Sequence, residues 1–317
     1  MNKYPFHLVQ FEREGQLGDK SILCKRPFSD IDRTFRADAR RFVPGEQLDT
    51  AINTAIAVGE PLLITGEPGT GKTQTAYYAA YKLDIEPVIH FQVKSDSTAH
   101  DLLYHFDTVR YFHDANLRNF ERHSYPELDK NNYVEPRVLW QAFIQAKEKG
   151  VPQVVLIDEI DKAPRDFPND LLHELDKMEF VVKETGDNIS APRHLRPIVF
   201  ITSNSERRLP EPFLRRCVYH HIHFDDRIIE KAVAVRKDEF GNLSEEFLKM
   251  AIQRFLTLRN RALRKRPATS ELLVWLQVLN LDTRIDFKRL DEELSKLPYL
   301  GVLLKDHQDI EELSKGN

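Results

Sequence analysis

The sequence predicts an α/β fold, in which a parallel five-stranded sheet is flanked by helices and followed by a smaller C-terminal α-helical domain. Three observations support this prediction. Five apolar runs of strand length alternate with helical stretches as far as Phe224, and such alternation is typical of a parallel sheet covered on both faces. A glycine-rich segment joins the first run to a helix, and strand signals end at Asp225.

The elements of the predicted core follow in chain order. A helix is expected over residues 46–58, where apolar residues recur at helical spacing. The expected strands are 61–65, 87–93, 153–157, 197–203 and 218–224. Helices over 74–82, 139–149 and 169–178 lie between most of these strands.

The two ends of the chain differ from this core. Residues 1–40 are polar and charged, and we expect them to have little structure of their own or to pack on the core. Beyond Asp225 three stretches, 244–258, 270–279 and 284–297, are amphipathic, and the first two begin with capping residues. The predicted organisation is an N-terminal extension (1–40), an α/β core (41–225) and a helical domain (226–317).

Composition and charge exclude several classes of protein. Of the 317 residues, 41% are apolar and 30% are charged, so the chain can bury a sizeable core. A net charge of −4 gives no bulk attraction to nucleic acid or to an anionic membrane. The N-terminus lacks the apolar stretch of a signal peptide, and no run approaches the ~18 apolar residues of a membrane span. Cys24 and Cys217 lack metal-ligand spacing and are expected to be reduced thiols in a cytoplasmic protein.

Residues 66–73 match a phosphate-binding loop and directly follow the first apolar run. Small residues let backbone N–H groups curl around a polyphosphate, and the next helix directs its positive end at the same phosphates. Lys72 supplies a charge for the outer phosphates, and Thr73 offers a hydroxyl to Mg²⁺. The alternative is a strand–helix turn without a ligand. The expected nucleotide contacts are Gly66, Glu67, Pro68, Gly69, Thr70, Gly71, Lys72, Thr73 and Gln74.

Two carboxylates follow the buried strand 153–157, at the end of the strand where ligands sit in open α/β sheets. Asp158 is placed to hold Mg²⁺, directly or through a water. Glu159 is placed to polarise a water that attacks a γ-phosphate. The alternative is a solvated acidic turn, which the phosphate-binding loop makes less favoured.

Two further positions carry candidate polar residues, one after strand 197–203 and one before strand 218–224. Asn204, after strand 197–203, could align the attacking water, or it could form an Asx-turn at the strand end. Arg215 and Arg216 are ordinary surface charges in a monomer. In a ring they would reach the γ-phosphate of a neighbouring subunit, where such a finger contributes on the order of 10³–10⁵ in rate.

Together these segments resemble an AAA+ ATPase of the MoxR type. The resemblance covers about residues 43–224 and rests on the loop at 61–73, on 158–164 with the helix 170–175, and on 201–204. It implies ATP and Mg²⁺ as cofactors, a helical lid and a hexameric ring. MoxR-type proteins carry a Leu-Asp-Arg-Phe run at the finger. Because this chain has Leu214-Arg215-Arg216-Cys217, Arg216 is the first choice for the finger and Arg215 the second.

The chain departs from the family pattern in the lid. Relatives carry an arginine at the start of a lid helix that senses the γ-phosphate, and the matching position here is Ser270 or Glu271. Lys265 or Arg266 could substitute. The other interpretation is that the lid cations form a solvated helix face, and a nucleic-acid patch is less favoured because interleaved aromatic residues are missing.

Two further patterns remain open. Insertions that line the pore of the ring in relatives would fall at 95–110 and 180–196, and Tyr104 stands where they often have glycine. Apolar residues there could grip a partner or simply pack. His220, His221 and His223 lack an evident further metal ligand, so packing or capping roles are favoured over a metal site.

The resemblance implies an ATP-dependent remodelling or regulatory factor for a protein partner, often one that bears a von Willebrand factor A domain. Two alternatives stay open. One is a nucleotide-gated assembly switch, in which binding rather than turnover gives the signal. The other is a GTP-using subunit of a defence or restriction system, because the phosphate-binding loop does not encode base specificity.

Overall fold

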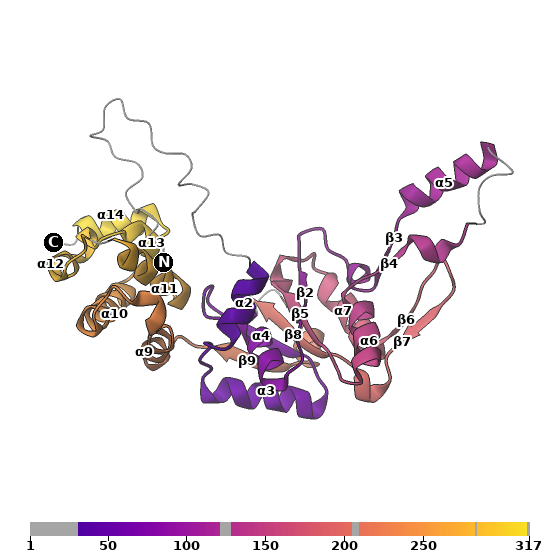
Figure 1. Cartoon of the computed structure of the whole chain (residues 1–317), viewed down its shortest axis with the longest axis horizontal. Coiled ribbons are helices and arrows are strands. Elements are labelled where there is room, and N and C mark those ends of the chain that lie inside the picture. The colour runs from indigo at the N-terminus through magenta and orange to yellow at the C-terminus, as the bar shows by residue number, and fades with distance from the viewer. Residues whose placement is uncertain (1–30, 121–127, 205–208, 283, 316–317) are drawn as a thin grey trace. The chain divides into compact units, whose positions relative to one another are not determined.

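The computed structural model describes residues 31–120, 128–204, 209–282 and 284–315 (Figure 1). The chain divides into two compact units. The first, here called the sheet unit, comprises residues 44–66 and 72–222. The second, here called the lid unit, comprises the described residues up to Val43, the loop 67–71 and the chain from His223 onward.

A five-stranded parallel sheet forms the centre of the sheet unit and confirms the predicted fold class. The strands lie in the order β2-β5-β8-β1-β9, and every neighbouring pair is parallel. Their bounds are β1 (Leu62–Gly66), β2 (Ile89–Gln92), β5 (Val154–Asp158), β8 (Ile198–Ser203) and β9 (Val218–Ile222). β1 and β5 are buried along their whole length, as expected for strands covered on both faces.

Helices flank this sheet close to the predicted positions. α3 (Glu46–Val58) contacts β1 and β9, α4 (Lys72–Leu83) contacts β1, β5 and β8, and α6 (Val138–Lys149) contacts β2 and β5. α7 (Phe167–Lys177) follows a short turn, η3 (Ile160–Lys162), and α8 (Glu211–Leu214) precedes β9. Glycines in the left-handed conformation end α3 and α6, at Gly59 and Gly150.

Two antiparallel pairs lie outside the main sheet. β6 (Glu179–Val181) pairs with β7 (Asn188–Ser190), and η4 (Arg193–Leu195) follows. After η1 (Ala99–Leu102), β3 (Tyr104–Phe106) pairs with β4 (Val134–Pro136), and α5 (Thr108–Phe120) and η2 (Lys130–Tyr133) lie between them in sequence. The segments expected to line a pore therefore contain regular structure.

Part of the first of these segments packs inside the sheet unit. Leu102, Leu103 and Tyr104 are buried, and the Tyr104 ring stacks on Phe180 with ring centroids 6.1 Å apart. The hydroxyl of Tyr104 accepts a hydrogen bond from the backbone of Lys183. Of the two roles left open by the sequence, packing is the one that these residues have here.

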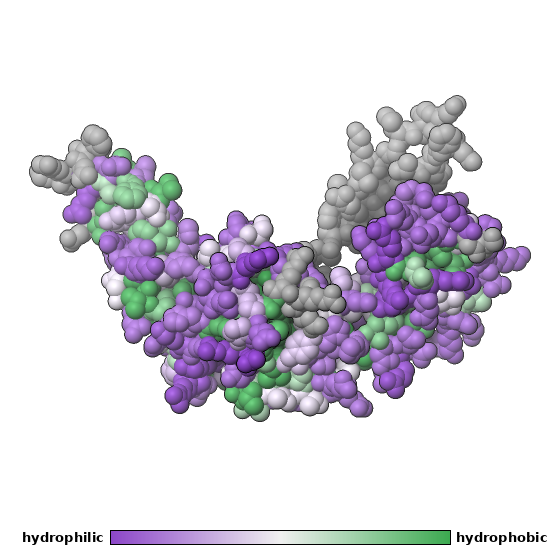
Figure 2. Space-filling view, turned by 180° about the vertical axis from the view of Figure 1, so that it is seen from behind, coloured by the Kyte–Doolittle hydropathy of each residue, from purple (hydrophilic) through white to green (hydrophobic). Residues whose placement is uncertain are grey.

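The helix α5 exposes apolar side chains. Val109 and Phe112 are 82% and 59% exposed, and Figure 2 shows hydrophobic surface along this helix. The other described residues therefore leave both side chains largely open to solvent. α5 was not predicted from the sequence.

Helices make up most of the lid unit. Their bounds are α2 (Ile31–Ala39), α9 (Asp226–Val235), η6 (Lys237–Phe240), α10 (Glu245–Arg259), α11 (Thr269–Leu281), α12 (Phe287–Asp291), η7 (Leu294–Lys296), α13 (Leu300–Leu303) and α14 (His307–Lys315). Their apolar faces meet around Phe255, Leu272 and Trp275, which are fully buried. The indole N–H of Trp275 donates to the Pro298 carbonyl at 2.7 Å, so burying this large ring leaves no orphaned donor.

One predicted helix of the lid unit was wrong. Residues 284–297 contain α12 and the short turn η7, which are separated by Glu292 and Glu293. Leu290, Leu294 and Leu297 all point into the lid core, so their spacing mimics a continuous amphipathic helix. The hydrogen bond from the Arg289 amide to the Asp286 side chain caps α12 inside the predicted span.

The N-terminal part of the chain is described from Ile31 onward. α2 belongs to the predicted extension. Asp38 of α2 pairs with Arg236, and Arg41, just after α2, pairs with Asp238 and Glu239, so this segment packs on the later helices of the lid unit. Residues 1–30, with Cys24, lie outside the described residues. Among the described helices, none combines the length and apolar character that a membrane crossing requires.

Candidate functional site

The phosphate-binding loop joins the end of β1 to the start of α4, as the motif predicts. Gly69 and Gly71 have φ values of +78° and +94°, a region in which a side chain would be strained. A Cβ on Gly71 would also come within 2.8 Å of the Phe42 ring. The hydroxyl of Thr70 donates to the Glu67 carbonyl at 2.7 Å and closes the loop on itself. The backbone is therefore held in the curled shape that anion binding requires.

Lys72 is the first residue of α4, and only 7% of it is exposed. Its ammonium donates to the carbonyl of Gly66 at 2.9 Å, so the charge stays at the phosphate-binding loop. The helix begins at the same point, and the positive end of its dipole adds to the potential there. Gln74, the last residue of the predicted nucleotide set, is buried in the first turn of α4.

Asp158 ends β5 and is almost fully buried, at 6% exposure. The Thr73 hydroxyl lies 3.1 Å from both of its carboxylate oxygens, and Thr202 on β8 donates to Oδ1. His90 Nε2 lies 3.4 Å from Oδ2, close enough for attraction but not aligned as a hydrogen bond. Burial alone would raise the pKa of Asp158, but His90, Thr202 and Thr73 together hold it below the usual range.

The pair formed by Thr73 and Asp158 fits a bound Mg²⁺. Hard cations of this kind prefer oxygen ligands, and Mg²⁺ in nucleotide sites uses one or two protein oxygens together with phosphates and water. A hydroxyl and an ionised carboxylate in contact, at the edge of the sheet beside the phosphate-binding loop, supply that donor set.

Glu159 adopts the left-handed conformation, with φ of +61°, which is uncommon for a residue other than glycine. Its N–H donates to the Thr202 hydroxyl at 2.9 Å, which holds this backbone in place. The carboxylate accepts a hydrogen bond of 2.6 Å from the Gln92 amide and is paired with the Lys162 ammonium. This contact with Glu159 is the main reason that the pKa of Lys162 is raised.

Asn204 lies at the same edge of the sheet, directly after β8. Its amide nitrogen is 3.5 Å from Glu159 Oε1, and its backbone N–H donates to Asp161 at 2.9 Å. The Ser203 hydroxyl also donates to Asp161. The structure thus brings Glu159 and Asn204 together, as the sequence predicts, and Asp161 fixes the backbone that carries Asn204.

The two arginines of the predicted finger lie near the amino-terminal ends of the strands, opposite to the ends that carry Asp158 and Asn204. Arg216 precedes β9, and Val218 is in register with Leu62, the first residue of β1, whereas the phosphate-binding loop follows the last. Arg216 forms an ion pair with Asp176 of α7, and Arg215 pairs with Glu211 at 3.2 Å. The side chains of Arg215 and Arg216 are both more than half exposed.

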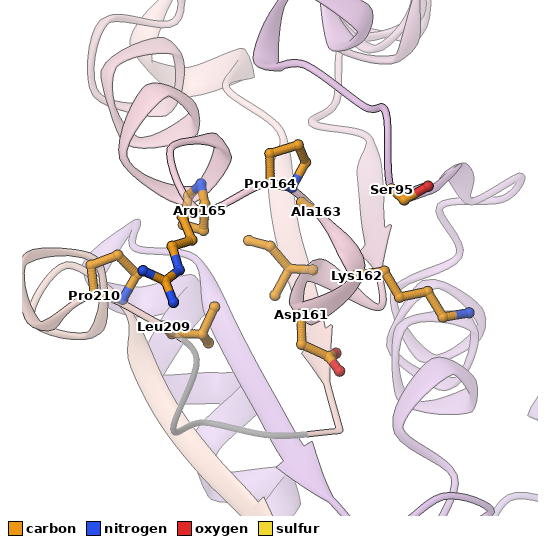
Figure 3. Close-up of a pocket in the computed structure, with 10 residues that line it drawn as sticks. Ser95, Asp161, Lys162, Ala163, Pro164, Arg165, Leu209 and Pro210 are labelled. Carbon is orange, nitrogen blue, oxygen red and sulfur yellow. The ribbon is translucent and has the colours of Figure 1, made fainter.

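A cavity of about 840 Å³ is lined by Asp161 and Lys162, which follow Glu159 in the sequence (Figure 3). Pro164 and Arg165 line it from the turn before α7, and Ser95 lines it from the segment after β2. Figure 3 shows Arg165 pointing toward Leu209 and Pro210, while Lys162 extends away from it. The cavity lies beside the candidate site and does not contain the phosphate-binding loop.

Sequence reasoning missed four residues of this site. His90 and Gln92 on β2, Thr202 on β8 and Lys162 after β5 all contact one of the two carboxylates. Gln92 and Thr202 each lie at the carboxyl end of a predicted strand, and this position could have identified them. Nothing in the pattern distinguishes Lys162 from an ordinary exposed lysine.

Of the histidines near the end of β9, His221 contacts the neighbouring strand through its side chain. His221 Nδ1 lies 2.8 Å from the Thr65 hydroxyl on the neighbouring strand. Within the described residues, no group of three or more His, Cys, Asp or Glu side chains has the arrangement of a metal site.

The start of α11 meets the phosphate-binding loop inside the lid unit. The Ser270 N–H points at the Gly69 carbonyl at 3.4 Å, and both Ser270 and Glu271 would contact a Cβ on Gly69. Glu271 caps its own helix through the Ala268 N–H. Lys265 and Arg266 are exposed in the preceding segment, and the Lys265 N–H donates to Asp309.

Comparison with known proteins finds a similarity for the core. The family model of the AAA domain (dynein-related subfamily) matches residues 61–217. This stretch of the chain is therefore similar to an AAA domain. The match begins before β1 and ends at Cys217, just before β9, so it includes the phosphate-binding loop, both carboxylates, Asn204 and both arginines. The subfamily is a coarser assignment than the MoxR type, which stays a prediction.

Other comparisons add little to this. A predicted ATPase from Cytophaga hutchinsonii, solved as a crystal structure, is similar at a TM-score of 0.40 and 14% sequence identity. The match covers 89% of this chain and 93% of that one. Among curated proteins, no sequence matches this chain.

Proposed function

We propose that this chain is a Mg²⁺-dependent ATPase that acts as a ring. The observation that carries the proposal is the set of contacts at one edge of the sheet. There the Thr73 hydroxyl meets Asp158, and Asn204 approaches Glu159, directly beside the phosphate-binding loop. The AAA domain match over residues 61–217 supports a nucleotide as the ligand.

Each residue has a role that follows from its position. The loop N–H groups and Lys72 bind the phosphates of ATP. Thr73 and Asp158 hold Mg²⁺, which neutralises phosphate charge when it is bound. Glu159 accepts a hydrogen bond from water and orients it toward the γ-phosphate, and Asn204 fixes the direction of that water. The lowered pKa of Asp158 keeps this carboxylate ionised at neutral pH.

The location of Arg216 supports catalysis between subunits. A strand of five residues spans roughly 16 Å, so an arginine just before β9 lies far from the phosphates that the loop after β1 would bind. An exposed guanidinium at that edge is available to a neighbouring copy. The hexameric ring, and the protein partner with a von Willebrand factor A domain, come from the MoxR resemblance. Val109 and Phe112 on α5 offer an exposed apolar contact for such a partner.

One observation favours a second candidate, a nucleotide-gated switch. Gln92 and Lys162 both contact Oε2 of Glu159, so this oxygen is not free to orient water in this arrangement. A protein that keeps this arrangement with ATP bound would bind nucleotide and hydrolyse it slowly.

Phosphate release with Mg·ATP and with Mg·GTP tests the proposal. We expect ATP turnover by the wild type, no turnover by Lys72→Ala, and at least a hundredfold lower kcat for Glu159→Gln with ATP binding retained. An exposed residue, Glu148→Gln, is the matched control and should behave as wild type. Binding without turnover in the wild type would instead identify the switch. Preference for GTP would contradict the assignment of ATP.

A further inference from the structure

Arg259, the last residue of α10, is a charged side chain that the lid unit buries almost completely. Only 6% of it is exposed. Its guanidinium lies 3.6 Å from the centroid of the Phe224 ring and donates to the Pro267 carbonyl at 2.5 Å. A second nitrogen donates to the carboxylate of Glu67 at 2.5 Å.

This arrangement uses what distinguishes arginine from lysine. The planar guanidinium stacks on an aromatic ring while its edge donates several hydrogen bonds in fixed directions. Burying a cation is costly unless it is paired and hydrogen-bonded, and here both requirements are met. An exposed surface cation would need none of these contacts.

Glu67 is the partner that gives the contact a functional meaning. It is the first residue after β1 and lies in the phosphate-binding loop, where the motif requires no acidic side chain. A carboxylate within about 10 Å of a polyphosphate repels it at ordinary ionic strength. Because the Glu67 carbonyl also accepts from Thr70, movement of this residue would disturb the loop backbone.

We propose that Arg259 is a positioning residue of the lid unit, which neutralises Glu67 and holds it away from the bound phosphates. This inference rests on the proposed nucleotide site. It also accounts for the missing arginine at the start of α11, where Ser270 and Glu271 lie against the loop instead. The lid cation then acts on the loop itself, through Glu67.

The test is a titration of Mg·ATP by calorimetry, with an exposed lid arginine, Arg261→Gln, as the matched control. Arg259→Gln removes this cation from Glu67 and leaves the carboxylate charge un-neutralised by the lid, and we expect its Kd to rise about tenfold or more. Glu67→Gln removes the repelling charge, so its Kd should change less than about threefold. Adding Glu67→Gln to Arg259→Gln should restore the Kd to within about threefold of wild type. Higher salt should shrink the defect of Arg259→Gln, because repulsion is screened.

The rescue separates positioning from packing. If Arg259 only stabilises the lid, the double variant stays as weak as Arg259→Gln, and the inference is wrong. It is equally wrong if Arg259→Gln binds like wild type. If Arg259→Gln does not fold, Arg259→Lys alone and with Glu67→Gln gives the same comparison, and absence of rescue there also overturns the inference. Nucleotide binding by the wild type and Arg261→Gln, lost in Lys72→Ala, shows that the proposed site stands whichever result is found.

Discussion

At the scale of single residues, the candidate site depends on side chains that keep charges in defined places. Asp158 is buried, but His90 on β2, Thr73 on α4 and Thr202 on β8 lower its pKa by more than burial raises it, so the carboxylate stays ionised. Glu159 is the opposite case, since a cation and an amide hold its carboxylate in place. The contacts of Asp158 suit a carboxylate that stays in place to bind Mg²⁺. Those of Glu159 suit a carboxylate that must be released before it can orient water.

The pairing of Glu159 with Lys162 leads to a prediction about turnover. Lys162→Met removes the cation and leaves the neutral amides of Gln92 and Asn204 at the carboxylate, so Glu159 should orient water more often. We expect kcat to rise up to about fivefold, the scale of an exposed ion pair. Lys130→Met, at an exposed position on η2, is the control. Steady-state phosphate release measures the effect, and a fall in kcat would show that Lys162 assists the reaction.

Cys217, next to Arg216, gives a prediction about pH. Burial raises the pKa of its thiol to about 12 from an ordinary value of 9.0, so the folded protein favours the neutral thiol. The raised pKa stabilises the fold fully below about pH 9, and this stabilisation is lost as pH rises toward 12. In a Cys24→Ser background, iodoacetamide at pH 8 should label Cys217 at least about a hundredfold more slowly in the native protein than in denaturant. Equal rates would contradict the burial of this thiol.

At the scale of elements, the sequence predicted those helices, strands and loops that depend on local residue patterns. The phosphate-binding loop, the five strands and the ends of α3 follow from glycine positions, apolar runs and helical spacing, and the structure agrees to within a few residues. The predicted helix 284–297 was wrong because leucines at helical spacing can also be buried by a short helix and a separate turn that face the same core. His90 could not be assigned, since its contact with Asp158 depends on β2 lying beside β5.

The cap of α10 is an element-scale feature that the sequence did predict, and it can be measured. The Ser244 hydroxyl accepts a hydrogen bond from the Phe247 N–H at 3.1 Å. Ser244→Ala should lower the free energy of unfolding by about 1 kcal/mol, because that N–H loses its partner. Thr257→Ala, at an exposed position in the same helix, should change it by less than about 0.5 kcal/mol. Urea titration of both variants, followed by circular dichroism, decides whether the cap contributes.

At the scale of the whole molecule, the parallel sheet places the candidate catalytic groups at one edge and Arg216 near the other. This separation follows from the register, in which Leu62 pairs with Val218 while Thr65 pairs with Ser203, directly before Asn204. No rearrangement of side chains within one sheet closes that distance. If Arg216 takes part in catalysis, two copies of the chain must therefore share each site.

A mixing experiment tests this sharing. Arg216→Ala and Glu159→Gln should each lose most ATPase activity, while Arg215→Ala should keep more of it. In an equimolar mixture of the two inactive variants, about a quarter of the sites would combine an intact Glu159 with an intact Arg216 from the neighbour. Activity should therefore reappear on mixing, rise with total protein concentration, and fail to appear when Arg216→Ala is mixed with itself. The loss of the exposed pair with Asp176 should cost little stability, so a melting temperature close to wild type excludes misfolding as the cause. If the mixture stays inactive although both variants assemble, Arg216 does not act across an interface, and the site must obtain its positive charge from its own chain.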